Sequence, residues 1–145
     1  MGSSLLLELV WGYKINFKQF AKILGIKINW KKIKQLDIEK SNKKLKKILN
    51  KHETEIESWM FDKKPFVMYK LEHNDDPPIK DYRDLKFIFG IYVKQLCDTE
   101  EGSYVQAIEI KVSKKNKKKL EKFSEKYKKL KNKKAKFIVY YNLLI

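Results

Sequence analysis

Cysteine, arginine, glycine and proline are all scarce in this chain of 145 residues. Cys97 is the single cysteine, which excludes an internal disulfide and any metal site built from several cysteines. Such low cysteine use is typical of reducing compartments, so we expect an intracellular protein. No apolar run approaches the roughly 18 residues that span a bilayer, and we expect no membrane partner.

Motifs that mark enzymes are missing as well: there is no Walker loop, GxGxxG, GxSxG or HExxH. His52 falls on the apolar stripe of a predicted helix, where a core or boundary histidine is more common than a catalytic one. His73 stands among Asn and Asp residues before two prolines, which is more typical of a polar turn than of a cation site. Neither histidine is placed to activate Cys97. We therefore expect no enzyme, no metal ion and no cofactor.

Positive charge dominates what is present, with a formal net charge of +16. Residues 1–51 hold 13 lysines against 3 acidic residues, and residues 111–145 hold 14 lysines against 2. The middle, residues 52–110, is acidic, with 13 acidic residues against 7 basic ones. Two basic blocks around an acidic middle favour a polarised surface, which could attract a polyanion.

The basic residues are almost all lysine, because Arg83 is the one arginine among 34. Lysine binds phosphate as a point charge, whereas base edges and bidentate clamps favour arginine. A nucleic-acid complex would then depend on the phosphate backbone, weaken with salt and read little sequence. The same lysine excess, with abundant Ile and Asn, is also what an AT-rich coding sequence produces without selection for binding.

Hydrophobic periodicity predicts a single α+β domain over residues 1–145. We expect a largely antiparallel sheet of about five strands covered by three or four helices, in the order β-α-α-β-β-β-α-β. The predicted strands are 5–15, 65–73, 85–96, 104–112 and 136–145, and the predicted helical segments are 16–24, 29–33, 37–59 and 113–134. Asn16, Asn29 and Ser113 are suitable N-caps, and Gly25 is a suitable helix end.

The segment from Leu85 to Val112 is expected to be the centre of the sheet. Its first strand is apolar on both faces, as central strands are, and CDTEEGS then predicts a hairpin turn. The helix expected over 37–59 is basic in its first half, with Glu53, Glu55 and Glu57 in its second. Carboxylates near a helix C-terminus are disfavoured by the helix dipole.

Two lysine-rich helical segments provide the candidate binding residues. We expect a sequence-tolerant nucleic-acid-binding protein that contacts phosphates without catalysis. The candidate contacts are Lys43, Lys44, Lys46 and Lys47 in the first segment, with Lys114, Lys115, Lys118 and Lys122 in the second. The alternative is a structural or interaction module, a virion or viral-factory component, that self-associates or docks on a protein partner through its basic and acidic surfaces.

Residues 41–134 give the order helix, three strands, helix, and VSKKNKKKL begins the last helix. This arrangement resembles the double-stranded-RNA-binding domain, in which a Ser-Lys-Lys-x-x-Lys motif contacts phosphates. The resemblance implies that role for Ser113, Lys114, Lys115 and Lys118. The family's Gly-Pro-x-His loop is absent, and HNDDPPIKDYRD stands in its place.

A second resemblance rests on composition. The strand-and-glycine segments VWGYKI and FIFGIYV, in a chain rich in Lys, Ile and Asn, are similar to small proteins of AT-rich giant DNA viruses. This similarity implies no activity. It implies a location in the cytoplasm, a viral factory or a virion.

Overall fold

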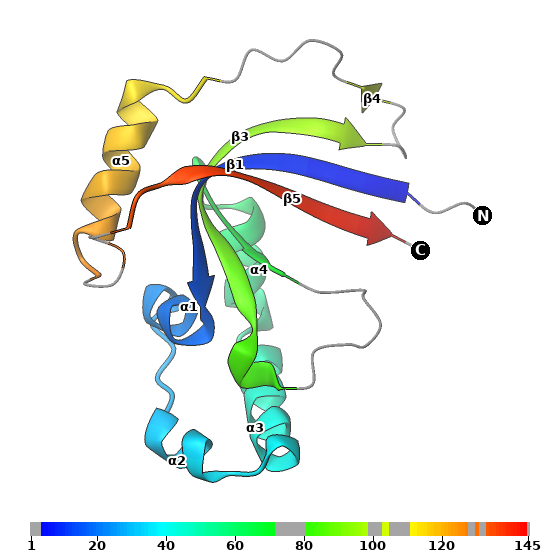
Figure 1. Ribbon diagram of the computed structural model, residues 1–145, viewed down its shortest axis with the longest axis vertical. Helices are drawn as coiled ribbons and strands as arrows, with labels where there is room; N and C mark the ends of the chain where they lie inside the picture. The colour runs from blue at the N-terminus through cyan, green and yellow to red at the C-terminus, as the bar shows by residue number, and fades with distance from the viewer. Residues whose placement is uncertain are drawn as a thin grey trace.

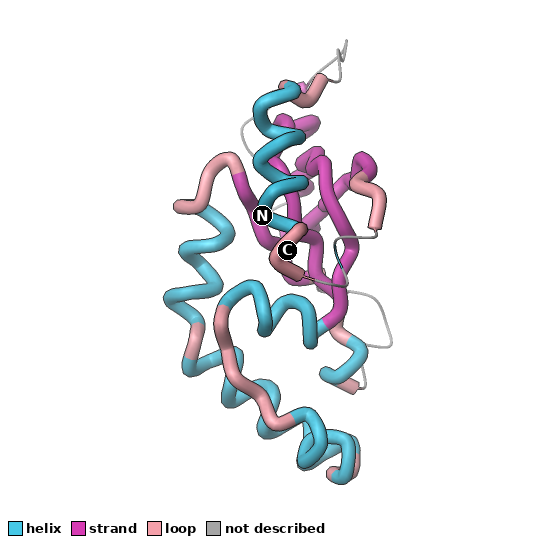
Figure 2. The backbone as a smooth tube through the Cα atoms, turned by 90° about the vertical axis from the view of Figure 1, so that its left-hand side faces the viewer, coloured by secondary structure: helices cyan, strands magenta, loops and turns pink. Residues whose placement is uncertain are grey.

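The computed structural model describes residues 4–71, 81–98, 103–104, 111–127, 130 and 133–144 and has an α+β fold, as predicted (Figure 1). Its elements are β1 (Ser4–Asn16), α1 (Phe17–Leu24), α2 (Trp30–Gln35), α3 (Ile38–Lys51), α4 (Glu53–Phe61), β2 (Phe66–Lys70), the 3-10 turn η1 (Tyr82–Asp84), β3 (Lys86–Asp98), β4 (Ser103–Tyr104), α5 (Lys114–Ser124) and β5 (Lys136–Leu144). Figure 2 shows that the helices lie in front of the strands, to their left and below them.

The sheet is antiparallel and is built on two long strands. Its order is β2-β3-β1-β5, and the short β4 pairs with the end of β3. The central position predicted for strand 85–96 is confirmed, and the last strand, β5, pairs with β1. Four strands rather than about five form the main order in the described part of the chain. The predicted strand 104–112 is described as a strand only at its start, and residues 105–110 lie outside the described residues.

Strands β1 and β3 approach each other closely at a pair of facing glycines. Gly12 is the register partner of Gly90. A Cβ at Gly12 would lie 2.1 Å from the carbonyl oxygen of Phe89, and one at Gly90 would lie 2.3 Å from that of Trp11. Both strands change direction sharply along their length (Figure 1). The close backbone approach therefore explains why each strand has a glycine where a strand normally prefers a bulky residue.

Alternating side chains divide the core between the two faces of the sheet. One face carries the larger cluster, in which Phe20 of α1 stacks on Phe87 of β3 with ring centroids 3.8 Å apart. Leu45 of α3 and Leu120 of α5 are buried in the same cluster. The other face buries a smaller cluster, Val10, Val67, Tyr69 and Ile88. Both faces of β3 are thus apolar and covered, as its sequence predicts.

Helix boundaries follow the predicted caps. The Asn16 side chain accepts a hydrogen bond from the Gln19 N–H, and the Gln19 side chain accepts one from the Asn16 N–H, which completes a capping box. Gly25 ends α1 with a left-handed φ of 75°. Asn29 and Ser113 cap α2 and α5.

The helix predicted over 37–59 is wrong as a single helix. It divides at His52, which ends α3 and precedes α4, so the described part of the chain has five α-helices rather than three or four. His52 is half-buried and its Nδ1 lies 3.1 Å from a carboxylate oxygen of Glu55. Because of the break, Glu53 and Glu55 occupy the first turn of α4, where the helix dipole favours carboxylates. The unfavourable interaction with the helix dipole that the sequence predicted is therefore absent for Glu53 and Glu55.

The helix predicted over 113–134 is also shorter than expected, because α5 ends at Ser124. The sequence predicts an apolar stripe of Leu120, Phe123, Tyr127 and Leu130 at helical spacing, and this stripe is nevertheless confirmed. Leu120 and Leu130 are buried, and Phe123 and Tyr127 pack against the same cluster. The apolar contacts with the core therefore continue past the end of α5, through Tyr127 and Leu130.

Candidate nucleic-acid interface

A cap within α5 and two contacts with β1 fix this helix on the sheet with its lysines outward. Ser113 accepts a hydrogen bond from the Asn116 N–H at the start of the helix. Near its end the buried Ser124 hydroxyl accepts a hydrogen bond from the Tyr13 hydroxyl of β1 at 3.3 Å. Between them, the Lys117 ammonium lies 4.7 Å from the ring centre of Trp11. Lys117 therefore helps to hold the helix, while its neighbours face solvent.

The eight lysines predicted as phosphate contacts are all exposed, but they form two separate groups. Lys114, Lys115, Lys118 and Lys122 lie on α5, and Lys43, Lys44, Lys46 and Lys47 lie on α3. The two helices lie toward opposite ends of the long axis of the molecule (Figure 1). The structure thus keeps each predicted group together and does not join the two in one patch.

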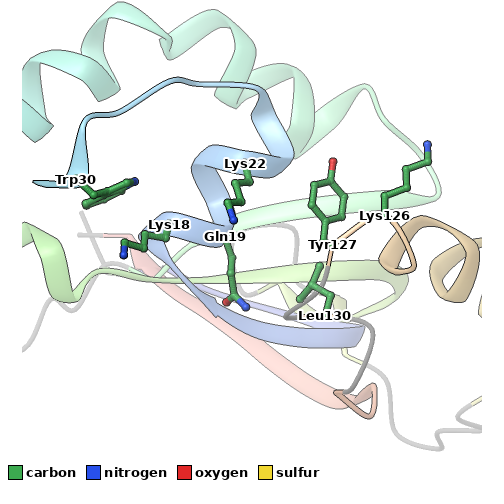
Figure 3. A pocket seen from close by; sticks show the side chains of 7 residues that line it. All are labelled: Lys18, Gln19, Lys22, Trp30, Lys126, Tyr127 and Leu130. Carbon is green, nitrogen blue, oxygen red and sulfur yellow. The ribbon is translucent and has the colours of Figure 1, made fainter.

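A hollow of about 560 Å³ lies where α1 and α2 meet the turn after α5 (Figure 3). We call it the basic hollow, and its lining residues are Lys18, Gln19, Lys22, Trp30, Lys126, Tyr127 and Leu130. Lys18 and Trp30 lie at one end of it, and Lys126 and Tyr127 lie at the other. The described lining residues include three cations and no acidic side chain, so the hollow attracts anions.

The two aromatic side chains of the basic hollow are held by neighbouring rings. Trp30 packs edge to face on Phe17, with centroids 5.5 Å apart, and Tyr127 lies against Phe123 at 5.4 Å. Burial raises the pKa of the Tyr127 hydroxyl, which therefore stays protonated at neutral pH. Both rings are only half-buried, so part of each is accessible. Supported, half-exposed rings can stack with a planar ligand at a small entropic cost.

The basic hollow was missed by the sequence reasoning. Lys18 and Lys22 are four residues apart in α1, a spacing that places them on one side of the helix. This spacing is the one local signal for the hollow. The approach of Lys126 to α1 depends on the tertiary fold and has no signal in the local sequence.

Arg83 is not among the described residues that line the basic hollow. Its guanidinium holds Asp81 through hydrogen bonds of 2.8 to 3.1 Å. The same contact holds the pKa of the Asp81 carboxyl below its ordinary value. The chain's one bidentate donor is thus engaged within η1, and lysines carry the accessible charge.

Comparisons with known proteins give no family: no family model matches the chain, and no match is found among curated proteins or solved structures. The predicted resemblances to double-stranded-RNA-binding domains and to viral proteins therefore stay predictions. Among the described residues, no three His, Cys, Asp or Glu side chains gather closely enough to hold a metal ion. No helix within these ranges has both the length and the apolar character that a bilayer span needs.

Proposed function

We propose that this protein is a non-enzymatic nucleic-acid-binding protein that contacts the phosphate backbone with little sequence specificity. The observation that carries the proposal is the basic hollow, which combines three lysines with two supported aromatic rings in about 560 Å³. Phosphates would lie against Lys18, Lys22 and Lys126. A base would stack on Trp30 or Tyr127.

The outer face of α5 extends this site. Lys122 lies in the last turn of α5, and Lys126 of the basic hollow lies in the turn that follows this helix, so exposed lysines continue from α5 to the hollow. A strand following this route would meet Lys115, Lys118 and Lys122 before reaching the hollow. The lysines of α3, at the other end of the molecule, would make no direct contact, and salt would largely screen their attraction at that distance.

The accessible rings favour an unpaired base as the ligand. Stacking on an aromatic side chain needs a base whose face is open, as in single strands, loops and ends. Such stacking tolerates every base, and lysines read no base edges as arginine forks do. The combination supports binding of single-stranded segments with low sequence discrimination.

Intrinsic tryptophan fluorescence and a labelled single strand of about twelve nucleotides test the proposal, since this length is within the usual range for such sites. We expect the oligonucleotide to quench Trp30 and to bind more tightly than a duplex of equal length. Trp30→Leu should remove most of the quenching, whereas Trp59→Leu should not. Equal affinity for duplex and single strand, with no quenching, would remove the base-stacking site.

A second candidate function, self-association, is favoured by the exposed stripe on β5. Phe137, Val139 and Tyr141 share one face of this strand and are 42%, 48% and 61% exposed. β5 ends the strand order of the sheet, and an apolar edge strand readily pairs with another strand. A second copy of the chain would be the partner.

Sedimentation measurements distinguish this candidate from association through basic and acidic surfaces. Pairing at β5 should persist or strengthen in high salt and be lost in Val139→Lys. Association through the charged surfaces should disappear as salt rises. As a further part of the proposal, the single cysteine and the viral resemblance favour action inside the cell, in the cytoplasm, a viral factory or a virion.

A further inference from the structure

A second hollow, of about 360 Å³, lies against the smaller cluster of the sheet, on the face opposite the larger core. We call it the tyrosine hollow. Its lining residues are Glu8, Met60, Phe61, Lys64, Val67, Tyr69, Tyr92 and Tyr140. They come from β1, the end of α4 and the turn after it, β2, β3 and β5. Segments distant in sequence thus meet at one aromatic surface.

Glu8 is the acidic group of the tyrosine hollow. Its half-buried carboxylate accepts a hydrogen bond from the Tyr69 hydroxyl. Within the described part of the chain no lysine or arginine lies at ion-pair distance from Glu8, although Lys64 lines the same hollow. A partly desolvated carboxylate without a cationic partner costs free energy, and this chain has 33 lysines that could have supplied one. The arrangement leaves one negative charge available to an external cation.

Three tyrosines surround this charge. Tyr69 and Tyr140 stack in parallel with centroids 4.3 Å apart, and Tyr92 lines the same space. Burial and the neighbouring carboxylate of Glu8 raise the pKa of Tyr69 and of Tyr92. The phenols of Tyr69 and Tyr92 therefore stay neutral and add no second negative charge beside Glu8, while the faces of the aromatic rings attract cations through their quadrupole.

The chemistry of this lining narrows the class of cation. A calcium ion takes six to eight oxygen ligands, and one carboxylate cannot supply them. A primary ammonium has three donors, and each donor needs an acceptor when it leaves water. An alkylated ammonium has few donors or none and is weakly hydrated, so it suits aromatic faces beside a single charge. The volume also leaves room for the methylene chain attached to such a group.

We propose that the tyrosine hollow binds an alkylated ammonium group, either the side chain of a methylated lysine or a small quaternary amine, with Glu8 as counter-ion and the tyrosine rings as its walls. This site lies apart from the basic hollow and does not depend on nucleic-acid binding.

Titration of the full chain by nuclear magnetic resonance tests the proposal with a matched pair of ligands. Choline and 3,3-dimethylbutanol have the same shape, but only choline carries the positive charge. We expect choline to shift tyrosine ring signals and to bind about tenfold or more tightly than the neutral alcohol. Equal binding of the two, or binding of neither choline nor a trimethyllysine peptide, would overturn the proposal.

Two peptides that differ only in trimethylation of one lysine identify the source of the group. Preference for the trimethylated peptide over both the unmodified peptide and choline would assign the site to a protein partner. Binding of choline alone would assign it to a small amine. Both results support an alkylammonium site, whereas preference for the unmodified peptide would contradict it.

Variants then test the roles of named residues. Glu8→Gln keeps an acceptor for the Tyr69 hydroxyl and should weaken choline binding about tenfold, whereas Glu39→Gln on exposed α3 should have no effect. Lys64→Gln should strengthen binding a few fold, because it removes a competing cation from the lining. Unchanged binding in a folded Glu8→Gln protein would show that Glu8 is not the counter-ion and would overturn the proposal.

Discussion

The basic hollow and the tyrosine hollow are both lined by aromatic rings, but their charged groups have opposite signs. In the first, Lys18, Lys22 and Lys126 surround Trp30 and Tyr127. In the second, Glu8 lies among tyrosines, and Lys64 is the single lysine among the described lining residues. The comparison shows that a net charge of +16 does not determine the sign of the electrostatic potential in a given hollow. Where apolar surroundings strengthen electrostatics, one carboxylate can decide which ligand a site attracts.

We expect the largest loss of stability from Gly12→Val. Both hollows depend on the folded β1–β3 pair, so this variant should also disrupt both. A side chain at Gly12 would begin 2.1 Å from a backbone oxygen of the neighbouring strand, and only a shift of the strands could relieve that clash. We expect a loss of about 3 kcal/mol or more in the free energy of unfolding. Urea unfolding checks this.

The control for that prediction is Gly25→Ala, at a position with a φ of 75° and open space around its Cβ. It should cost only about 1 to 2 kcal/mol, the penalty of a left-handed backbone for alanine. Equal losses in the two variants would show that the close approach of the strands at Gly12 is not a strong constraint.

One aromatic substitution in each hollow tests whether the two hollows bind different ligands. Trp30→Leu keeps apolar packing but removes an indole face, and it should weaken single-strand binding by about 1 kcal/mol or more. Tyr92→Leu should weaken choline binding by about 0.5 to 1 kcal/mol. Neither should affect the other ligand. Fluorescence anisotropy measures oligonucleotide binding, and chemical-shift titration measures choline binding. If one variant weakened the binding of both ligands equally, the two hollows would not be separate sites.

The Tyr69→Phe variant tests the hydrogen bond within the tyrosine hollow. It removes the donor to Glu8 and leaves a half-buried carboxylate without that partner. We expect a loss of about 1 to 2 kcal/mol in the free energy of unfolding at neutral pH. The exposed Tyr141→Phe serves as control and should change stability very little. Identical thermal unfolding of both variants would contradict the role assigned to this bond.

The smallest effect concerns pH and the Asp81–Arg83 pair, which lies away from both hollows. The hydrogen bond from Arg83 lowers the folded-state pKa of Asp81 below its ordinary value of 3.8. The stabilisation is therefore present above about pH 4 and is lost as the pH falls through the folded-state pKa. Asp81→Asn should be slightly less stable than wild type at pH near 7, and this difference should shrink below about pH 4.

Thermal unfolding across this pH range, with Asp62→Asn as control, provides the measurement for Asp81. Asp62 is exposed at the end of α4 and has no corresponding ion pair among the described contacts. A difference between Asp81→Asn and wild type that grows in acid would contradict the sign of the linkage.

Local sequence signals predicted most of the fold. The apolar pattern of β3 predicted its two covered faces correctly, and Asn16, Gly25 and Ser113 set helix boundaries where expected. The break at His52 was missed because the apolar stripe continues through it, from Ile48 to Ile56.

Both hollows were beyond local reasoning, since each joins residues that are distant in sequence. Glu8 stands between apolar residues of the predicted strand 5–15, and the local sequence does not indicate a role for it. Its partner Tyr69 is 61 residues away. The lysines of α1 could have been singled out by their spacing, but their approach to Lys126 depends on how α5 docks through Ser124. The density of lysines along the sequence indicated residues 43–47 and 114–122 instead.

The central claim, a localised phosphate site, is tested most directly by the salt dependence of single-strand binding in two charge-matched variants. Lys18/Lys22/Lys126→Gln empties the basic hollow of charge, and Lys43/Lys46/Lys47→Gln removes three charges from exposed α3. The first should flatten the slope of log K against log salt by about 2, at roughly 0.7 per lost phosphate contact, and the second should leave it nearly unchanged. Equal changes in both variants would contradict the claim and show that binding follows total charge alone.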